Sequence, residues 1–515
     1  MSDITAINKR IAKNTVLLYI RTFFVMIISI YVSRVILQNL GVEDYGIYNV
    51  VGGLVAMFSI ISNSLSAAIS RFITFEIGTK NIERLHQVFS TGKTVLLILA
   101  GAVVILTEFI GLWFLTTQMK IPDGRMTAAI WVLQCSIVTF FVDLLAIPYN
   151  ACVIAHEHMK AFAYISILEA VLKLGICFLL KISPIDKLIF YAVLMMILAV
   201  IIRGIYGIYC NRHFEESRIP AHFYKPVFKE MFGFAGWSFF TSANSTLCDQ
   251  GVNMLINVFF GVTFNAARGV ANQIKGAMIH FVSSFVSAIN PQITKSYAVG
   301  DTDTMFSLVC RGARISYFLT LVMVVPVFFE AEQILNIWLT VVPEKAVVFT
   351  RLSLIYILMD GAGYTLYTAN LSTGRIKKYS IVLSIITFFV FPLSWLAYYL
   401  GAPVELAYIF DIIANLFYHI ARLFLTQENV GLKAMTYVKN VYVPVLKTTV
   451  LAVVPSILIC HFMPTSYLRL AISLVAGIGM TGLAALYVGM TKNEREIVLD
   501  KIGSVYDKLF PGRKN

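Results

Sequence analysis

Residues 94–116 read TVLLILAGAVVILTEFIGLWFLT, and Glu108 is the one charged residue among them. A run of this length and character meets the requirement of about 20 apolar residues for a helix that spans a bilayer. Thirteen further stretches have the same character and, with this one, fill almost the whole chain. The sequence therefore predicts an all-α membrane protein with fourteen transmembrane helices. Their predicted cores are residues 15–37, 45–69, 94–116, 127–152, 161–180, 187–209, 232–259, 264–289, 310–329, 347–371, 379–400, 404–425, 442–462 and 467–489.

The composition agrees with a membrane protein. Of the 515 residues, 58% are hydrophobic and 13% are charged, which leaves too little polar surface for a water-soluble body. The net charge of +13 would suggest nucleic acid in a soluble protein, but here Lys and Arg gather in alternate loops. Basic loops stay on the cytoplasmic side of a membrane. The sequence thus predicts no nucleic-acid partner, and a multi-pass membrane protein with both termini in the cytoplasm.

The ends of the chain and its cysteines add negative expectations. The first apolar run has full spanning length and no cleavage pattern, so we expect a first transmembrane helix and not a cleaved signal peptide. The seven cysteines lack CxxC spacing, which predicts neither disulfides nor a metal site, and no motif indicates a cofactor. The run His156-Glu157-His158 is expected to be a solvated loop.

The chain repeats itself at an offset near 220 residues. Gly41, Val42, Val50, Ser64, Ala68 and Ile69 correspond to Gly261, Val262, Val270, Ser284, Ala288 and Ile289. Because the repeat holds six helices, its two copies share one orientation, as in transporters with parallel repeats. The predicted domains are an N-lobe at 1–210, a cytoplasmic linker at 211–229, a C-lobe at 230–430, two extra helices at 431–490 and a cytoplasmic amphipathic tail at 491–515.

Polar residues at helical spacing mark the faces of three helices. Such stripes line either a wet cavity or a close helix contact, and for the serines alone both readings stay open. Cations far from helix ends are costly in lipid and favour the cavity. The candidate substrate-binding residues are Arg21, Arg268, Lys275, Asp249, Asn272, Ser242, Ser245, Asn63 and Ser66, and no catalytic residue is predicted.

Other charges inside the predicted helices receive separate interpretations. Glu169 and Lys173 are four residues apart and predict an ion pair on one helix surface. Asp143 and Asp360 occupy equivalent repeat positions, which suggests a shared structural or gating role, while Asp411 and Lys447 have no obvious partner. Three arginines near helix ends are expected to snorkel to the interface: Arg34, Arg311 and Arg314.

The duplicated lobes, the polar and basic eighth helix and the start of the second helix, Leu40-Gly41-Val42-Glu43-Asp44-Tyr45-Gly46-Ile47-Tyr48, resemble one known family. This is the polysaccharide-exporter branch, the lipid-linked oligosaccharide flippases, of the multidrug/oligosaccharidyl-lipid/polysaccharide (MOP) superfamily. The resemblance implies a V-shaped transporter of two six-helix lobes plus two C-terminal helices. In related flippases, arginines of helices 1 and 8 line the central cavity, and Arg21 and Arg268 lie in those helices here.

The same resemblance implies the function. A flippase of this kind works in the bacterial cytoplasmic (inner) membrane. It moves an undecaprenyl-pyrophosphate-linked oligosaccharide, such as an O-antigen or capsule repeat unit, from the cytoplasmic to the periplasmic leaflet by alternating access. Its partners would be that lipid-linked oligosaccharide, membrane lipids and polysaccharide polymerase machinery. Two alternatives are a cation-coupled multidrug or metabolite antiporter of the same superfamily, and a membrane enzyme. The enzyme is disfavoured because the sequence has neither a large outer loop nor a reactive cluster at one membrane face.

Overall fold

A computed structural model gives the fold of the chain. It describes residues 14–29, 59–117, 124–183, 185–260, 262–339 and 342–492, with short pieces at 31–32, 35–36, 39–40, 44, 47–48, 51, 121, 494–496 and 499. Arg34 and residues 45–46, 49–50 and 52–58 of the second predicted helix lie outside the described residues, as does most of the predicted tail.

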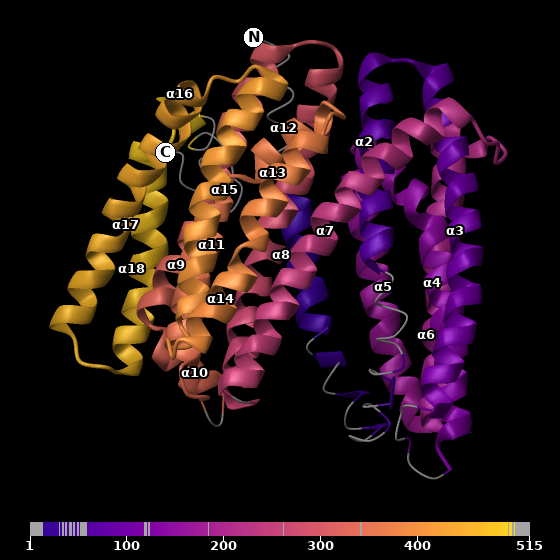
Figure 1. The fold of residues 1–515 in the computed structure, drawn as a ribbon, viewed down its shortest axis with the longest axis horizontal. Helices are drawn as coiled ribbons and strands as arrows, with labels where there is room; N and C mark the ends of the chain where they lie inside the picture. The colour runs from indigo at the N-terminus through magenta and orange to yellow at the C-terminus, as the bar shows by residue number, and fades with distance from the viewer. Residues whose placement is uncertain are drawn as a thin grey trace, which may run out of the picture. The chain divides into compact units, whose positions relative to one another are not determined.

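The described residues are helical almost throughout (Figure 1). After a first helix at Asn14–Ser29, the long helices of the N-terminal part are α2 (Ser59–Thr79), α3 (Ile82–Thr117), α4 (Met126–Ala155), α5 (Met159–Leu179) and α6 (Lys187–His213). Next come α7 (Lys225–Phe260), α8 (Val262–Ala298), α9 (Thr302–Phe329), α10 (Ala331–Trp338), α11 (Ala346–Gly361), α12 (Tyr364–Ser372), α13 (Lys377–Phe388), α14 (Val390–Tyr399) and α15 (Leu406–Val430). The chain continues through α16 (Ala434–Tyr437), α17 (Val443–Phe462) and α18 (Tyr467–Ala484).

These helices confirm an all-α, multi-span membrane protein. In the part of the chain that the structure describes, eight helices are long and apolar enough to cross a membrane, or nine if α11 and α12, bent by 44°, form one span. Other helices, such as α7 and α8, are long enough but carry the polar stripes noted above. The count of fourteen spans therefore stays a prediction.

The chain divides into two compact units. Unit 1 comprises residues 1–243, 287–305 and 371–380, and unit 2 comprises residues 244–286, 306–370 and 381–515. Two segments of the C-terminal half, one from the end of α8 and one around the start of α13, thus belong to unit 1. The lobe boundaries predicted from the repeat remain a prediction.

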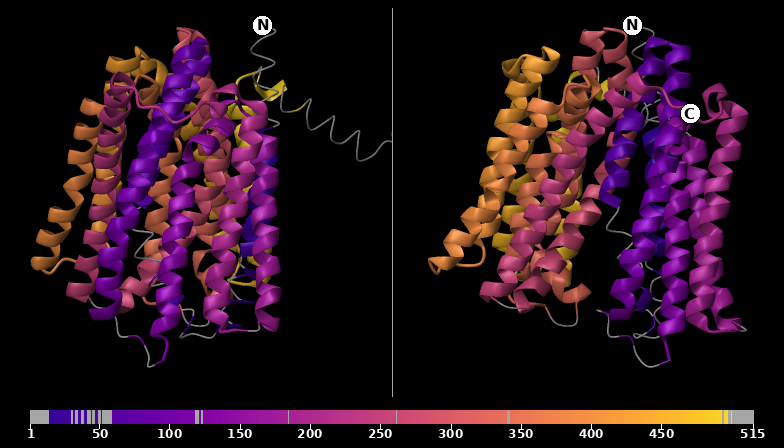
Figure 2. Two further views of the ribbon diagram at one scale, coloured as in Figure 1. Left: turned by 90° about the vertical axis from the view of Figure 1, so that its right-hand side faces the viewer. Right: turned by 45° about the vertical axis from the view of Figure 1, so that its right-hand side comes forward.

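In unit 1, α4 packs against α3 and α6, and the views agree on these neighbours (Figures 1 and 2). The end of α8 approaches α2 closely at Gly78, where a Cβ atom would lie 2.8 Å from Cβ of Ala298. Lys295 on the same segment of α8 pairs with the buried Glu157, with 2.6 Å between Nζ and Oε1. The expectation of a solvated His-Glu-His loop was therefore wrong: packing of distant helices buries the middle residue.

In unit 2, α17 and α18 form a hairpin that is tied to α9 at both of its ends. Arg314 on α9 donates a hydrogen bond to the Asn440 carbonyl at 2.7 Å and pairs with Glu494. Glu330, which follows α9, pairs with Arg469 of α18 at 2.9 Å. The prediction that Arg314 snorkels to the interface was wrong, because its guanidinium is buried and pairs with a carboxylate of the protein.

Candidate functional site

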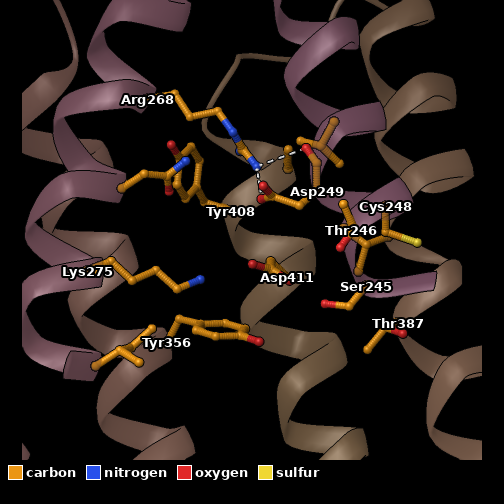
Figure 3. A pocket seen from close by; sticks show the side chains of 16 residues that line it. Ser245, Thr246, Cys248, Asp249, Arg268, Lys275, Tyr356, Thr387, Tyr408 and Asp411 are labelled. Carbon is orange, nitrogen blue, oxygen red and sulfur yellow. Dashed lines mark hydrogen bonds and ion pairs between the residues drawn. The ribbon is translucent and has the colours of Figure 1, made fainter. Parts of the chain in front are cut away.

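A polar cavity of about 450 Å³ lies within unit 2. Its walls come from α7, α8, α11, α13, α14 and α15 (Figure 3). The charged side chains in it are Asp249, Arg268, Lys275 and Asp411. Two cations and two carboxylates therefore share a space bounded by membrane helices.

The two cations come from one face of α8. Arg268 and Lys275 are seven residues apart, two helical turns, so both point the same way. Figure 3 shows both side chains extending from the same helix into the cavity. Their positions follow directly from the stripe that the sequence predicted.

Arg268 is held by the neighbouring helix α7. Its Nη2 donates to Oδ1 of Asp249 at 2.6 Å, and its guanidinium carbon lies 5.5 Å from the centre of the Tyr408 ring. The two side chains differ in freedom: 9% of the Arg268 side chain is exposed, against 53% of Asp249. The carboxylate is the exposed partner, so an anionic ligand can reach the position it occupies while the arginine stays buried.

Lys275 lies against an aromatic ring. Its Nζ is 4.0 Å from the centre of the Tyr356 ring on α11, a distance typical of a cation–π contact. Figure 3 shows the ammonium group directed toward Asp411 of α15. The ring supports the charge without occupying its hydrogen-bond donors, so Lys275 keeps donors for a ligand.

The structure gathers five of the nine predicted site residues in this cavity. They are Arg268, Lys275, Asp249, Asn272 and Ser245. Arg21 lies in a second cavity, in unit 1, whereas Ser242, Asn63 and Ser66 are not among the residues that line either of these two cavities. On α2, Asn63 is exposed and Ser66 is half-buried.

The second cavity, of about 240 Å³, contains Arg21, Glu169 and Lys173. The predicted ion pair is confirmed, with 2.8 Å between Lys173 Nζ and Glu169 Oε1. The guanidinium carbon of Arg21 lies 4.9 Å from the centre of the Phe162 ring. Unit 1 thus has a cationic pocket of its own.

Arg203 is a functional candidate that the sequence analysis missed. Its Nε lies 2.6 Å from Oδ1 of Asp143, and its Nη1 lies 3.9 Å from Oε2 of Glu169.

Unit 2 has related residues. Asp360, the repeat equivalent of Asp143, lies 3.9 Å from His419. Arg422, which donates to the Gly363 carbonyl at 2.9 Å, follows Arg203 at nearly the repeat offset. A comparison of arginine positions in the two repeats would have identified Arg203 and Arg422 as equivalent residues.

The remaining polar candidates have different surroundings. Asp411, without an assigned partner in the sequence, lines the unit 2 cavity with Lys275. Lys447 is exposed on α17 and lies outside both cavities. The aromatic rings of Tyr356 and Tyr408 carried no signal in the polar stripes, because a tyrosine ring is large and apolar and also packs between helices.

One group of described side chains could hold a metal ion. Ligand atoms of Cys152, His156 and Glu216 all lie within 4.8 Å of one another. Thiolate, imidazole and carboxylate are the ligand types of zinc sites.

The same three side chains are hydrogen-bonded to one another. Glu216 Oε1 lies 3.1 Å from the Cys152 thiol and 2.7 Å from His156 Nε2. Burial raises the pKa of Glu216, but these hydrogen bonds outweigh it and leave the pKa below its usual range. As an ionised acceptor, Glu216 fastens the linker to the end of α4.

If the unit 2 cavity contains water, a cysteine at Asn272 should react with a hydrophilic thiol reagent. The reaction needs the thiolate, which forms in water and not in hydrocarbon. Cys248 and Cys460, the two cysteines that are not buried, are first replaced by serine. Leu446→Cys, on the exposed face of α17, is the control and should stay unlabelled. Mass spectrometry of the intact protein measures labelling, and inertness of both Asn272→Cys and Ser245→Cys would mean that the stripe packs helices only.

The fold is that of solved transporters of the MOP superfamily. A point mutant of a MATE protein is 14% identical, with 81% of this chain and 96% of that chain covered and a TM-score of 0.70. An outward-facing multidrug resistance MATE family transporter of the MOP superfamily is 13% identical, with 81% and 96% covered and a TM-score of 0.67. A MOP superfamily transporter from Pyrococcus furiosus, whose binding pocket has a reverse polarity that suggests a different function, is 14% identical, with 81% and 96% covered and a TM-score of 0.67.

The family is given by the sequence. Residues 11–297, more than half of the chain, match the family described as Polysaccharide biosynthesis protein. The chain belongs to this family, as the resemblance predicted. A comparison with curated proteins finds no match.

Proposed function

We propose that the chain is a flippase that moves an undecaprenyl-pyrophosphate-linked oligosaccharide from the cytoplasmic to the periplasmic leaflet. The observation that carries the proposal is the pair Arg268 and Lys275, which enter one polar cavity from α8 in a member of a polysaccharide family. Arginine and lysine are the side chains that bind phosphate oxygens. All nine predicted site residues are proposed to lie along the substrate path, including Arg21, Asn63, Ser66 and Ser242, which do not line the unit 2 cavity.

A protein path is needed because the cargo cannot cross alone. A pyrophosphate and its hydrated sugars would lose their water over about 30 Å of hydrocarbon, at a cost far above thermal energy. In the unit 2 cavity, Ser245, Thr246 and Asn272 provide hydroxyl and amide groups beside the cations. Such groups accept and donate hydrogen bonds to sugars of varied structure, which suits a path for a glycan.

Asp249 gives the cavity a way to bind and release an anion. While the cavity is empty, the exposed carboxylate neutralises Arg268. An incoming pyrophosphate takes its place, and the return of Asp249 favours release. Binding therefore exchanges one anion for another and does not leave a cation bare in a low-dielectric site. Rocking of two lobes would then expose the cavity to each side in turn. No bond is made or broken in this cycle, so we propose a transporter and not an enzyme.

The runner-up is a cation-coupled antiporter. Asp249 and Asp411 are acidic groups in one membrane cavity, the residue type that binds a coupling cation. Against it, Asp249 already pairs with Arg268, and Lys275 is directed toward Asp411 (Figure 3). A cavity whose carboxylates face internal cations has less affinity for external ones.

Transport by the purified protein in vesicles separates the two functions. We expect it to flip a lipid-linked oligosaccharide and not to move a small cationic dye against a proton or sodium gradient. Asp249→Asn should keep flipping but slow it, by about tenfold if one charged hydrogen bond no longer competes with the substrate. Tighter binding of inorganic pyrophosphate should accompany the slower turnover. Dye transport that Asp249→Asn abolishes would establish the antiporter instead.

A further inference from the structure

An apolar groove of about 420 Å³ runs along the outside of α15, next to the polar cavity. Its walls are entirely apolar and come from two sides. The segment α13–α14 provides Ile386, Phe389 and Leu393, and α15 provides Phe410, Ile413 and Phe417. All of these residues belong to unit 2.

A proline accounts for a break in one of these walls. Pro392 has no N–H to donate to the carbonyl of Phe388, and the helix breaks there into α13 and α14. On the side of α7, the ring of Phe391 fills the space over Gly251, where a Cβ atom would lie 2.6 Å from the ring. The broken helix is thus fixed against α7, and the groove lies on its side toward α15.

The groove and the cavity are adjacent compartments. Val390 lines both of them. On each side of it, neighbouring residues face opposite ways: Thr387 lines the cavity and Ile386 the groove, and Asp411 lines the cavity and Phe410 the groove. One layer of side chains therefore separates a charged, polar space from an apolar one.

We infer that this groove holds the polyprenyl chain of the carrier lipid while its pyrophosphate occupies the cavity. This inference rests on the proposed function and adds to it the route of the lipid tail. An amphipathic cargo needs a polar and an apolar compartment side by side, because either half is costly in the medium of the other. From Phe410 to Ala421 the groove follows α15 for about 16 Å, at a rise of 1.5 Å per residue. That is roughly half of the hydrocarbon thickness.

The alternative occupant is an ordinary phospholipid acyl chain, which would fill the groove without regard to the cavity. Photo-crosslinking distinguishes the two. Phe417 in the groove and Phe424 beyond it are on the same helix, with exposed fractions of 57% and 64%. Each is replaced by p-benzoylphenylalanine in the full chain, in vesicles of phosphatidylglycerol with a small amount of undecaprenyl pyrophosphate.

We expect the Phe417 variant to capture undecaprenyl pyrophosphate several times more often than the Phe424 variant. Addition of inorganic pyrophosphate, which competes for the cavity, should reduce capture at position 417 alone. Equal capture at both positions would overturn the inference, since the groove would then hold bulk lipid.

A second variant tests the groove by filling it. Ala414→Trp places a large ring between the two walls, and Val475→Trp on the exposed face of α18 is the matched control. We expect Ala414→Trp to bind undecaprenyl pyrophosphate about tenfold more weakly, the equivalent of about two lost buried methylene groups. Its affinity for inorganic pyrophosphate should be unchanged, which also shows that the variant is folded.

The two failures are distinguishable. Suppose that Ala414→Trp and the native chain bind undecaprenyl pyrophosphate equally, while the binding of inorganic pyrophosphate still depends on Arg268. The assignment of the groove alone is then overturned. If inorganic pyrophosphate binds equally well without Arg268 and Lys275, the proposed substrate site is wrong. The assignment of the polyprenyl chain to the groove is then also wrong, because it rests on that site.

Discussion

Replacement of both Arg268 and Lys275 by alanine is expected to abolish export of the surface glycan. Each residue offers a charged hydrogen bond to the pyrophosphate, worth about 1.5–3 kcal/mol, or roughly ten- to hundredfold in affinity. Together the two changes should weaken binding by at least about a hundredfold. The readouts are surface polymer on cells that lack the native gene and the lipid-linked precursor that accumulates on the cytoplasmic side.

Several controls keep this result specific. Lys447→Ala removes a lysine from another membrane helix, outside both cavities, and should export normally. Arg268→Lys should restore export in part, because a point charge cannot reproduce the two-pronged guanidinium contact. Asp249→Asn combined with Arg268→Ala removes the carboxylate left alone by the single change, and should remain defective if the missing cation is the cause.

The variant that lacks Arg21, Arg268 and Lys275 is the decisive one. Loss of intramembrane charge relieves an insertion cost, so we expect normal amounts of protein in the membrane. Full export by this triple alanine variant at normal expression would refute the assignment of these cations as the substrate site.

Glu330→Ala should cause the largest loss of stability. No part of the Glu330 side chain is exposed, and its carboxylate accepts hydrogen bonds from Arg469 at 3.1 and 2.9 Å and from Ser473 at 2.8 Å. Glu330 is buried and Arg469 is half-buried, so removal of the carboxylate leaves the arginine's charge uncompensated and costs up to about 3–5 kcal/mol. The apparent melting temperature in detergent should fall, and α17 and α18 should become sensitive to protease first.

The matched control is the same substitution at an exposed pair. Glu230 pairs with Arg84 at 2.5 Å, and half of its side chain is exposed. Glu230→Ala should cost at most about 1 kcal/mol. Replacement of both Glu330 and Arg469 by leucine should recover much of the loss, since no buried charge then remains alone. Equal melting temperatures of Glu330→Ala and Glu230→Ala would contradict the structural role given to this pair.

Much of the fold could be predicted because helix formation and membrane crossing are local properties. The apolar run at 94–116 lies inside α3, and the run at 187–209 lies inside α6. The spacing of Arg268 and Lys275 placed both on one face of α8, which a helical period determines without knowledge of the neighbours. Asp249 lies 11 residues before the end of α7 and Arg268 six residues after the start of α8, so the sequence placed them on consecutive helices but did not determine their contact.

The partners of other residues could not be predicted, because they depend on how helices far apart in the sequence rotate and pack. Arg203 meets Asp143 across 60 residues, and Arg314 meets Glu494 across 180. For Arg314 the sequence showed a cation near a helix end, and only the packing of α9 against the C-terminal segment decided that it is buried and not snorkelled.

The sequence by itself determined the class of protein, the family and the face of α8 that bears the cations, since composition, family motifs and helical period are written along the chain. The tertiary structure decided which of these charges share a cavity. Ser242 and Ser245 lie on one predicted stripe, yet only Ser245 lines the cavity. A stripe defines a direction from one helix, whereas a cavity exists only where several helices face one another around space that their side chains do not fill.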